Sequence, residues 1–389
     1  MGKRAYIVVD HTIPTGHPNG LRVANIGLIL KELGYQVVLI GFEVGKTTTT
    51  FYKGMECVLL GERGGNGFFN ALKRDSEKLK SFKAFLESRE KPDVVISGLF
   101  NDNNQRYLMQ YCAKNKVKII ETVCEWFDRS NFKGIKGALK FINNRYSLMV
   151  QYRQIGNVLA ISNLLDDYYA RRGCNTATIP TIVDLEEYTQ VVNAPKSYDV
   201  PIKIAYAGSP ARKDYIANAI WALALLTEDE RKQLQLDFYG PTQEQLSVLG
   251  IPEEFWKQYC QGVVCHGRIP YEQVKTKIAQ ADFTVLLRPQ KRYANAGFPT
   301  KVGESMACGT PVIANLTSDL HKYIIDGKTG IVCADETPEA CAEAFRKVLA
   351  LTQETRMQMH ENCLEMARQA FDYRAYVDAM NDFLKNIIK

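Results

Sequence analysis

The chain has 389 residues, 46% of them hydrophobic and 24% charged, which is typical of a soluble globular protein whose length favours two domains over one core. The ten cysteines are scattered without a Cys-x-x-Cys pair, which argues against a zinc ribbon, a thioredoxin-like motif or a disulfide scaffold and favours reduced cytosolic thiols. The net charge of +6 fits anionic ligands or an anionic membrane surface and is too diffuse to indicate nucleic acid. The first residues enter a strand without a signal-peptide region, and no uncharged apolar run has the length of a membrane span.

Short apolar runs alternate with helical patterns in the first half of the chain, which predicts an α/β fold with a largely parallel sheet. A helix is expected over Arg22–Leu33, ending at Gly34, because glycine suits the position that follows a helix. The expected strands are Ala5–Val9, Gln36–Gly41, Asp93–Ser97, Val117–Thr122, Val158–Ser162 and Thr176–Ile179.

One segment of this half imitates a P-loop. Gly41-Phe-Glu-Val-Gly45-Lys46-Thr47 follows a strand, but only three residues separate its glycines, and a phosphate-binding P-loop needs four. The next residues, Thr48–Tyr52, form a β-like run where a P-loop would open a helix. We therefore reject a nucleoside triphosphatase.

A polar, irregular stretch from Ile182 to about Pro201 predicts a linker, and the α/β pattern then starts again. We expect a first domain at 1–185, a linker at 186–201 and a second domain at 202–372. A further helix is expected over Ala217–Leu226, and a final one over about Tyr373–Ile388. The expected strands of the second domain are Ile202–Ala207, Leu234–Tyr239, Val263–His266, Phe283–Leu287, Val312–Ala314 and Gly330–Val332.

The most informative segment is residues 295–314. Gly297, Phe298 and Pro299 predict a loop, and Thr300 begins a short helix that Gly309-Thr-Pro311 ends before a buried strand. Val302, Met306 and Ala307 would be the buried face of this helix. Its N-terminus favours phosphate oxygens, and Lys301 adds a full positive charge there. Glu304, one turn later, can accept hydrogen bonds from two sugar hydroxyls, so the segment predicts a nucleotide-sugar site.

This segment resembles the motif of retaining GT-B glycosyltransferases of family 4, in which two glutamates are separated by seven residues. Glu304 matches the second glutamate, whereas Ala296 stands where the first is usual. The resemblance implies a GT-B fold, with two Rossmann-like domains facing a central cleft. It also implies that the first domain binds the acceptor, that the second binds the nucleotide-sugar donor, and that the final helix crosses back onto the first domain.

The resemblance extends to other segments of the second domain. Gly208, Arg212 and Lys213 follow a strand where the family binds the donor diphosphate, with Lys213 at the matching lysine position and Ser209 in place of an arginine. Gly240 matches a strand-end glycine that faces the donor. Without the resemblance, Arg212 and Lys213 would be ordinary solvated residues.

The loop from His266 to Tyr271 corresponds to the family's base-binding loop. Arg268 and Ile269 are therefore expected to contact the base, whereas His266 is better explained as a strand-end histidine with its hydrogen bonds satisfied. Arg288 either faces the same site or is solvated.

In the first domain, Gly16 and Gly20 lie in a glycine-containing turn that the family uses near the donor phosphate, although a plain flexible loop has the same composition. Glu125 stands nearest a position where many family members have a histidine that contacts the donor sugar. A surface role is the alternative for Glu125.

A basic amphipathic stretch covers Phe132–Arg153, with cations interleaved among apolar residues. It has the composition of a helix that lies on an anionic membrane, where lipid-linked acceptors reside. The alternative is a helix packed on the sheet with its charged face in solvent.

The resemblance implies a hexosyl-type transfer from a nucleoside diphosphate sugar to an acceptor hydroxyl, with Glu125, Lys213 and Lys301 as the catalytic residues. The sequence contains no Asp-x-Asp pair and no cluster at metal-ligand spacing, so we expect neither a metal nor another cofactor. The expected partners are the donor and a saccharide or lipid-linked acceptor, without nucleic acid, in a cytoplasmic protein that is peripheral at the inner face of the membrane. Because Ala296 removes a carboxylate, a nucleotide-sugar-binding partner or sensor without transferase activity remains the second hypothesis.

Overall fold

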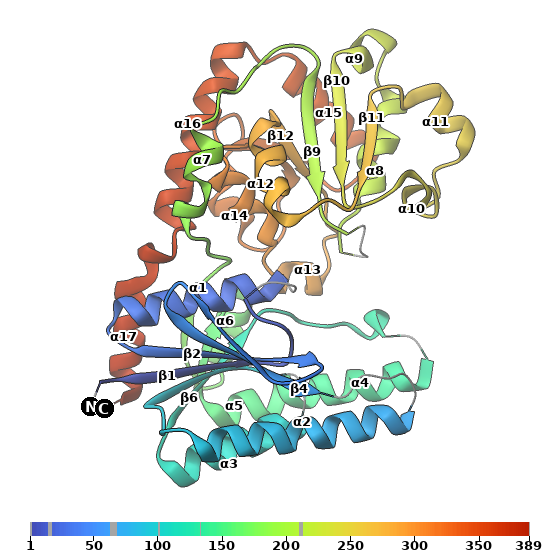
Figure 1. The fold of residues 1–389 in the computed structure, drawn as a ribbon. Coiled ribbons are helices and arrows are strands. Elements are labelled where there is room, and N and C mark those ends of the chain that lie inside the picture. Colours follow the sequence, from blue (N-terminus) through green and yellow to red (C-terminus); the bar gives the residue numbers. More distant parts are fainter. Residues whose placement is uncertain are drawn as a thin grey trace. The chain divides into compact units, whose positions relative to one another are not determined.

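The computed structural model describes residues 2–14, 18–62, 68–99, 102–132, 134–209 and 213–388. The chain forms two compact units (Figure 1): unit 1 contains Met1–Ile182 and Tyr373–Lys389, and unit 2 contains Val183–Asp372. Each unit has its own sheet with helices around it, which confirms the predicted α/β class. Within these described ranges no helix has the length and apolar composition needed to cross a bilayer.

Unit 1 is built on an eight-stranded sheet, as far as its described residues show, in the order β3-β4-β2-β1-β5-β6-β7-β8. All neighbouring strands pair in parallel except β3, which is antiparallel to β4. The strands are β1 Arg4–Val9, β2 Gln36–Val44, β3 Thr48–Tyr52, β4 Met55–Glu62, β5 Val94–Gly98, β6 Lys118–Val123, β7 Asn157–Ala160 and β8 Asn175–Thr178.

Both faces of this sheet are covered by apolar side chains. In β1, Ala5 and Ile7 belong to one core cluster and Tyr6 and Val8 to another, because successive side chains of a strand point to opposite faces. The first cluster includes residues of α1 (Pro18–Glu32) and of the last helix, and the second includes residues of α2 (Phe68–Ser88) and α3 (Asp102–Asn115). Figure 1 shows α1 on one side of the sheet and α2 and α3 on the other.

The last helix of the chain, α17 (Val377–Ile388), belongs to unit 1. Met380, Phe383, Leu384 and Ile387 repeat at helical spacing and are buried in the cluster that contains α1. The remaining helices of unit 1 are α4 Gly134–Tyr146, α5 Tyr152–Ile155, α6 Asn163–Ala170, the 3₁₀ helices η1 Arg129–Asn131 and η6 Tyr373–Tyr376, and the π-helix η2 Ser147–Gln151.

Unit 2 is built on a parallel sheet whose described strands number six, in the order β11-β10-β9-β12-β13-β14. The strands are β9 Ile202–Ala207, β10 Leu234–Tyr239, β11 Val263–Gly267, β12 Phe283–Leu286, β13 Val312–Asn315 and β14 Gly330–Cys333. The helices are α7 Thr189–Val192, α8 Ile216–Trp221, α9 Glu228–Lys232, α10 Gln243–Ser247, α11 Glu253–Tyr259, α12 Tyr271–Gln280, α13 Arg292–Ala296, α14 Thr300–Ala307, α15 Pro338–Leu349, α16 Gln353–Ala370, and the 3₁₀ helices η3 Leu185–Tyr188, η4 Ala222–Leu225 and η5 Leu320–Lys322.

The segment 186–201, which the sequence suggests as a linker, folds with unit 2. Its first residues form η3 and α7, and Tyr188 is only 3% exposed. Lys275 of α12 donates a hydrogen bond to the carboxylate of Glu187 at 2.7 Å. The first residues of the segment therefore pack within unit 2, which the polar sequence pattern does not reveal.

Of two further segments, the first agrees with the sequence-based expectation and the second differs from it. The run Thr48–Tyr52 is the strand β3, as its composition indicates, and it pairs with β4, which the sequence pattern did not predict. Gly20, expected in the loop before the first helix, lies inside α1. A Cβ atom there would lie 2.6 Å from the Pro14 carbonyl oxygen, so glycine lets the preceding loop cross close to the helix.

We expect Phe383→Ala to destabilise unit 1 by about 3–5 kcal/mol, because it removes a buried ring from the contact between α17 and its core cluster. The measurement is urea unfolding followed by the fluorescence of Trp126, after Trp221 and Trp256 of unit 2 are replaced by phenylalanine. Asn386→Ala, an exposed substitution on the same helix, is the control. An unchanged unfolding midpoint for Phe383→Ala would contradict the role of α17.

Candidate functional site

Three glycines lie at the carboxyl ends of the adjacent strands β9, β10 and β11. The amide of Gly208 donates to the Tyr239 carbonyl at 2.8 Å, and the amide of Gly240 donates to the Gly267 carbonyl at 2.7 Å. Gly240 has φ +119°, and a Cβ atom on it would lie 2.2 Å from the Gly208 carbonyl oxygen. The strand ends therefore approach each other more closely than a side chain at Gly240 would allow, at the edge of the parallel sheet where open α/β folds bind ligands.

Residues 297–315 fold as their sequence predicts. Pro299 is the N-cap of α14, Val302 and Met306 are buried, and Gly309 ends the helix with φ +70° before β13. The first turn of α14 places Lys301 and Glu304 three residues apart, so their side chains lie on neighbouring parts of one helix face.

Lys301 belongs to a cluster of charged and polar groups. Its Nζ lies 2.8 Å from Oδ2 of Asp214, and the Nε of Arg288 lies 3.6 Å from Oδ1 of the same carboxylate. The Tyr206 hydroxyl donates to Asp214 at 3.0 Å, and the ring of Tyr206 lies 5.2 Å from the Lys301 amine. The carboxylate thus holds Lys301 beside the glycine-lined strand ends.

Burial acts to raise the pKa of Asp214, but the charges of Lys301 and Arg288 outweigh it and hold that pKa below its usual value. Burial, reinforced by the Asp214 charge, raises the pKa of the Tyr206 hydroxyl, which therefore stays a hydrogen-bond donor. Two cations share one carboxylate, so the cluster keeps a net positive charge.

Gly208 permits the position of Lys301. A Cβ atom at Gly208 would lie 2.6 Å from the Lys301 Cε and 3.0 Å from its Nζ, and Gly208 also has φ +149°. The lysine side chain therefore occupies the space that the missing side chain leaves free.

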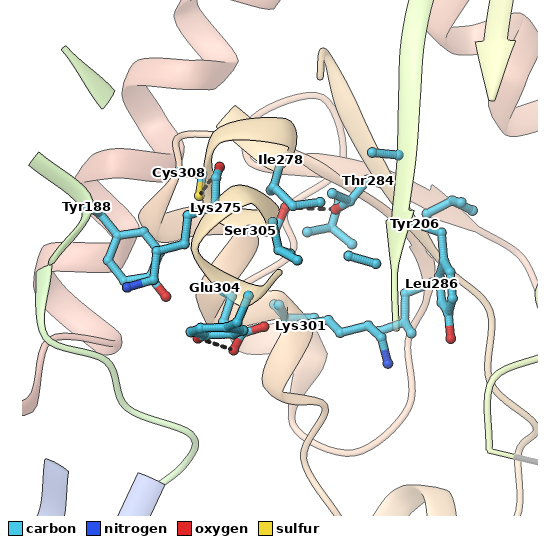
Figure 2. A pocket seen from close by; sticks show the side chains of 17 residues that line it. Tyr188, Tyr206, Lys275, Ile278, Thr284, Leu286, Lys301, Glu304, Ser305 and Cys308 are labelled. Carbon is cyan, nitrogen blue, oxygen red and sulfur yellow. Dashed lines mark hydrogen bonds between the residues drawn. The ribbon is translucent and has the colours of Figure 1, made fainter. Parts of the chain in front are cut away.

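Glu304 lies in the same pocket as Lys301, as Figure 2 shows. The Tyr271 hydroxyl donates to Oε1 of Glu304 at 3.4 Å. Burial raises the pKa of Glu304, and the nearby charge of Lys301 partly offsets this effect. The pocket therefore contains a carboxylate, Glu304, that can accept hydrogen bonds one helical turn from the cation Lys301.

Residues of η3 and α12 also line the pocket. Tyr188 and Lys275 line it, with the Lys275 amine 4.7 Å from the centre of the Tyr188 ring. Its other lining residues include Ser305 and Cys308 of α14. The sequence analysis did not identify three residues of the site: Asp214, Tyr206 and Tyr188. An aspartate that follows a glycine turn has no distinctive local pattern, and neither has a tyrosine in a strand or a linker.

The residues just before α14 lie in the interior of unit 2. Gly297, Phe298 and Pro299 are buried, and the Phe298 ring packs against Tyr323 and Phe371 at centroid distances of 5.5 and 6.0 Å. Thr300 is half-buried at the start of α14. Ala296 is fully buried at the end of α13, so this position offers no polar side chain to a donor.

The residues of the expected base-binding loop after β11 differ in their exposure and contacts. His266 contacts Oδ1 of Asp237 at 2.7 Å and stacks on the Tyr239 ring at 4.4 Å, so its hydrogen bonding is satisfied, as predicted. Arg268 is exposed and Ile269 is half-buried. Neither lines the pocket of Glu304, and their contact with a base stays a prediction.

Arg288 is 5% exposed, and its amide and carbonyl both bond to the Asn315 side chain, so it is not a solvated arginine. Lys213 is half-buried next to Asp214 in the chain, and its role in donor binding stays a prediction. Arg212 and Gly16, also expected at the donor, lie outside the described residues.

Glu125 of unit 1 is half-buried beyond the end of β6, and its proposed role is not tested by this position. A second carboxylate, Glu121, lies fully buried within β6 and accepts from Gln105 at 2.7 Å. Burial raises the pKa of Glu121 well above its usual value. In the part of the chain that is described, no group of three His, Cys, Asp or Glu side chains is placed to hold a metal ion.

The fold is shared with solved glycosyltransferases. Sucrose-phosphate synthase from Thermosynechococcus elongatus superposes with a TM-score of 0.74 at 18% identity, covering 99% of each chain. Anabaena HepE in complex with UDP and glucose superposes with a TM-score of 0.66 at 14% identity, covering 98% of this chain and 99% of that one. The chain therefore has the GT-B fold of two Rossmann-like domains, as the sequence resemblance predicted.

Within this fold, residues 190–366 match the family model of glycosyl transferases group 1, a span of slightly less than half the chain. An uncharacterized glycosyltransferase of Methanocaldococcus jannaschii is 19% identical over 65% of this chain and 64% of its own length. A GDP-mannose-dependent phosphatidylinositol dimannoside mannosyltransferase of Mycobacterium tuberculosis is 28% identical over 45% of this chain and 44% of its own length. The matches thus span from somewhat under half to nearly two thirds of these relatives.

We expect Asp214→Asn to destabilise unit 2 by about 3 kcal/mol at pH 7, because it leaves Lys301 and the buried Arg288 without their carboxylate. The folded-state pKa of Asp214 is depressed, so its contribution is complete above the unfolded pKa of about 3.9 and is lost as the pH falls through the folded pKa. The measurement is urea unfolding at pH 7, at about pH 5 and below the unfolded pKa, compared with wild type. It is followed by Trp221 and Trp256 fluorescence in proteins whose Trp126 of unit 1 is replaced by phenylalanine.

Glu365→Gln, which removes the exposed partner of Arg368, is the control for Asp214→Asn and should change stability little at any pH. A stability difference for Asp214→Asn that persists unchanged below the unfolded pKa would contradict the assignment.

Proposed function

We propose that the protein is a retaining glycosyltransferase of family 4 that moves a hexosyl-type group from a nucleoside diphosphate sugar to an acceptor hydroxyl. The observation that carries the proposal is the pairing of Lys301, held by Asp214, with Glu304 one turn later on α14. At this spacing, the cation can bind the diphosphate of a ligand while the carboxylate accepts hydrogen bonds from the ribose hydroxyls of the same ligand.

The diphosphate would bind at the start of α14. The first amides of a helix have no intrahelical carbonyl partners, and the helix dipole favours negative charge there. Lys301 and Lys213 would add cationic charge, and Gly208 and Gly240 would allow the backbone to approach the phosphates closely. These groups would balance the charge of the leaving diphosphate without a metal ion.

The ribose would bind at Glu304. Its carboxylate already accepts a hydrogen bond from Tyr271, and it keeps further lone pairs for the two ribose hydroxyls. Arg268 and Ile269 would contact the base from the loop after β11. Anabaena HepE and the M. tuberculosis mannosyltransferase are described with UDP-glucose and GDP-mannose, respectively, which supports a nucleotide-sugar donor without choosing the base.

For the chemistry, we propose that the departing diphosphate takes the proton of the acceptor hydroxyl on the face that the sugar leaves. The bond from the anomeric carbon to the diphosphate oxygen breaks as the bond to the acceptor oxygen forms on the same face, so the configuration is retained. Glu125 of unit 1 would bind a donor-sugar hydroxyl. Exclusion of water during the step would prevent hydrolysis of the donor.

The setting is part of the same proposal. A cytoplasmic enzyme of surface polysaccharide or glycolipid synthesis would act on a saccharide or lipid-linked saccharide, at the inner face of the cell membrane. The M. tuberculosis relative is named for a phosphatidylinositol dimannoside acceptor, which supports an acceptor of this kind.

A nucleotide-sugar-binding partner or sensor is the second candidate function. The buried methyl group of Ala296 favours it, because the carboxylate that the family usually has there is absent. Incubation with the donor and a panel of lipid-linked and free saccharides separates the two functions: transfer with retained configuration, seen by NMR of the product, supports the enzyme. Donor binding without transfer or hydrolysis supports the sensor.

The donor site is tested by calorimetry with UDP, GDP, ADP and their common sugar conjugates. One nucleotide series should bind, and Lys301→Ala and Lys213→Ala should each weaken it about tenfold or more because a charge-assisted contact to phosphate is lost. Lys291→Ala, an exposed lysine of the same unit, is the matched control and should bind as wild type does. If no nucleotide binds to the wild-type protein, the proposal fails.

The assignment of Glu304 has its own test. Wild type should prefer the ribonucleoside diphosphate over its 2′,3′-dideoxy form by about tenfold or more, and Glu304→Ala should abolish this preference. Lys301→Ala should weaken both ligands equally. A preference that survives in Glu304→Ala would assign the ribose to another residue.

A further inference from the structure

The helix α4 of unit 1 carries an apolar stripe on its exposed side. Ile135, Leu139 and Ile142 are 85%, 63% and 61% exposed. They repeat at the i, i+4, i+7 spacing of one helix face, and the stripe continues into η2. Its members, here named the α4 stripe, are Ile135, Leu139, Ile142, Tyr146, Met149 and Val150, all of them exposed.

The other side of α4 contacts the rest of unit 1. Gly137 is the buried residue of α4 and approaches Phe132 closely, and the Phe132 and Phe141 rings lie 5.9 Å apart. The Arg145 guanidinium lies 4.8 Å from the Trp126 ring centre. The contacts of α4 with unit 1 therefore lie away from the stripe, and the sequence-based alternative of a helix whose exposed face is simply charged does not describe it.

The sequence of α4 and η2, which carries the stripe, contains charged residues of one sign only. The sequence from Arg129 to Leu165 contains six lysines and arginines and no aspartate or glutamate. Lys136 and Lys140 are exposed and flank the stripe on one side of a helical projection. Arg145, on the other side, is half-buried against the Trp126 ring. An apolar strip bordered by cations is the pattern of a helix that lies in the plane of a membrane interface.

We infer that the α4 stripe and its flanking cations form the surface by which this protein docks on an anionic phospholipid membrane. The stripe enters the boundary between headgroups and acyl chains, and Lys136 and Lys140 contact the lipid phosphates. A second copy of the chain fits this surface less well, because pairing two stripes would bring like charges together. The inference deepens the membrane contact in the proposed function and rests on it only for its biological use.

The test is sedimentation of the purified protein with vesicles, without any sugar nucleotide, so that its outcome is independent of the donor site. Wild type should bind vesicles of phosphatidylglycerol mixed with phosphatidylcholine and leave those of phosphatidylcholine alone. Raising the salt from about 0.1 M to about 1 M should weaken binding, because the Debye length falls from about 10 Å to about 3 Å.

Two variants test the two components of the surface. Ile135→Ser/Leu139→Ser/Ile142→Ser should lower vesicle affinity about tenfold or more, since it removes the inserted apolar groups. Lys136→Glu/Lys140→Glu should lower it about 25-fold or more, at about fivefold for each lost lysine. The substituted side chains are all exposed, so folding should be unchanged by circular dichroism and thermal unfolding.

Matched controls carry equal changes on other exposed surfaces. Val44→Ser/Phe51→Ser/Val248→Ser removes exposed apolar groups elsewhere, and Lys46→Glu/Lys91→Glu reverses two exposed lysines outside α4. Both controls should bind vesicles more tightly than the corresponding α4 variants. Equal binding by the α4 variants and the wild type overturns the inference, as does a stripe-dependent dimer in solution without vesicle binding.

Discussion

The close approach of backbone and side chain at the end of β9 is the constraint on which the candidate site depends. Gly208 leaves a space that only a residue without a side chain can provide, and the Lys301 side chain passes through it to reach Asp214. Gly240 is subject to the same restriction from the neighbouring strand. The parallel sheet brings these strand ends to one edge, and α14 begins beside them, so a cation is held where an anion can be bound.

The polar groups around this constraint compensate one another. Asp214 would be costly to bury alone, and it stays charged because Lys301, Arg288 and the Tyr206 hydroxyl all contact it. Burial raises the pKa of Glu304, and its partners, among them Lys301 and the Tyr271 hydroxyl, offset this effect only in part. The two carboxylates near Lys301 therefore have different roles: Asp214 positions the cation, and Glu304, which lines the pocket, can accept further hydrogen bonds.

The elements of the two units could be predicted from the sequence to different degrees. In unit 2, the short strands and the segment 297–315 could be placed from apolar runs, glycines and prolines, because each signal is local. In unit 1, β4 and α2 were not anticipated. The strand β4 pairs with β2, and the end of β2 belongs to the segment that imitates a P-loop. The helix α2 is rich in charged residues, which obscure its apolar periodicity. The amphipathic pattern of α4 was visible, but whether its apolar face is buried depends on which elements pack against it.

The sequence by itself determined the class of fold, the repetition of an α/β pattern in two halves, and the presence of Lys301 and Glu304 at the start of one helix. These features follow from periodicity and from the conformations that glycine and proline favour, both of which act over a few residues. Only the tertiary structure decided that Asp214 binds Lys301, 87 residues away in the chain, and that the segment before β9 supplies Tyr188 and Glu187 to unit 2. The physical reason is that side-chain contacts between distant segments depend on how the strands are ordered in the sheet, and local residue pattern carries little information about that order.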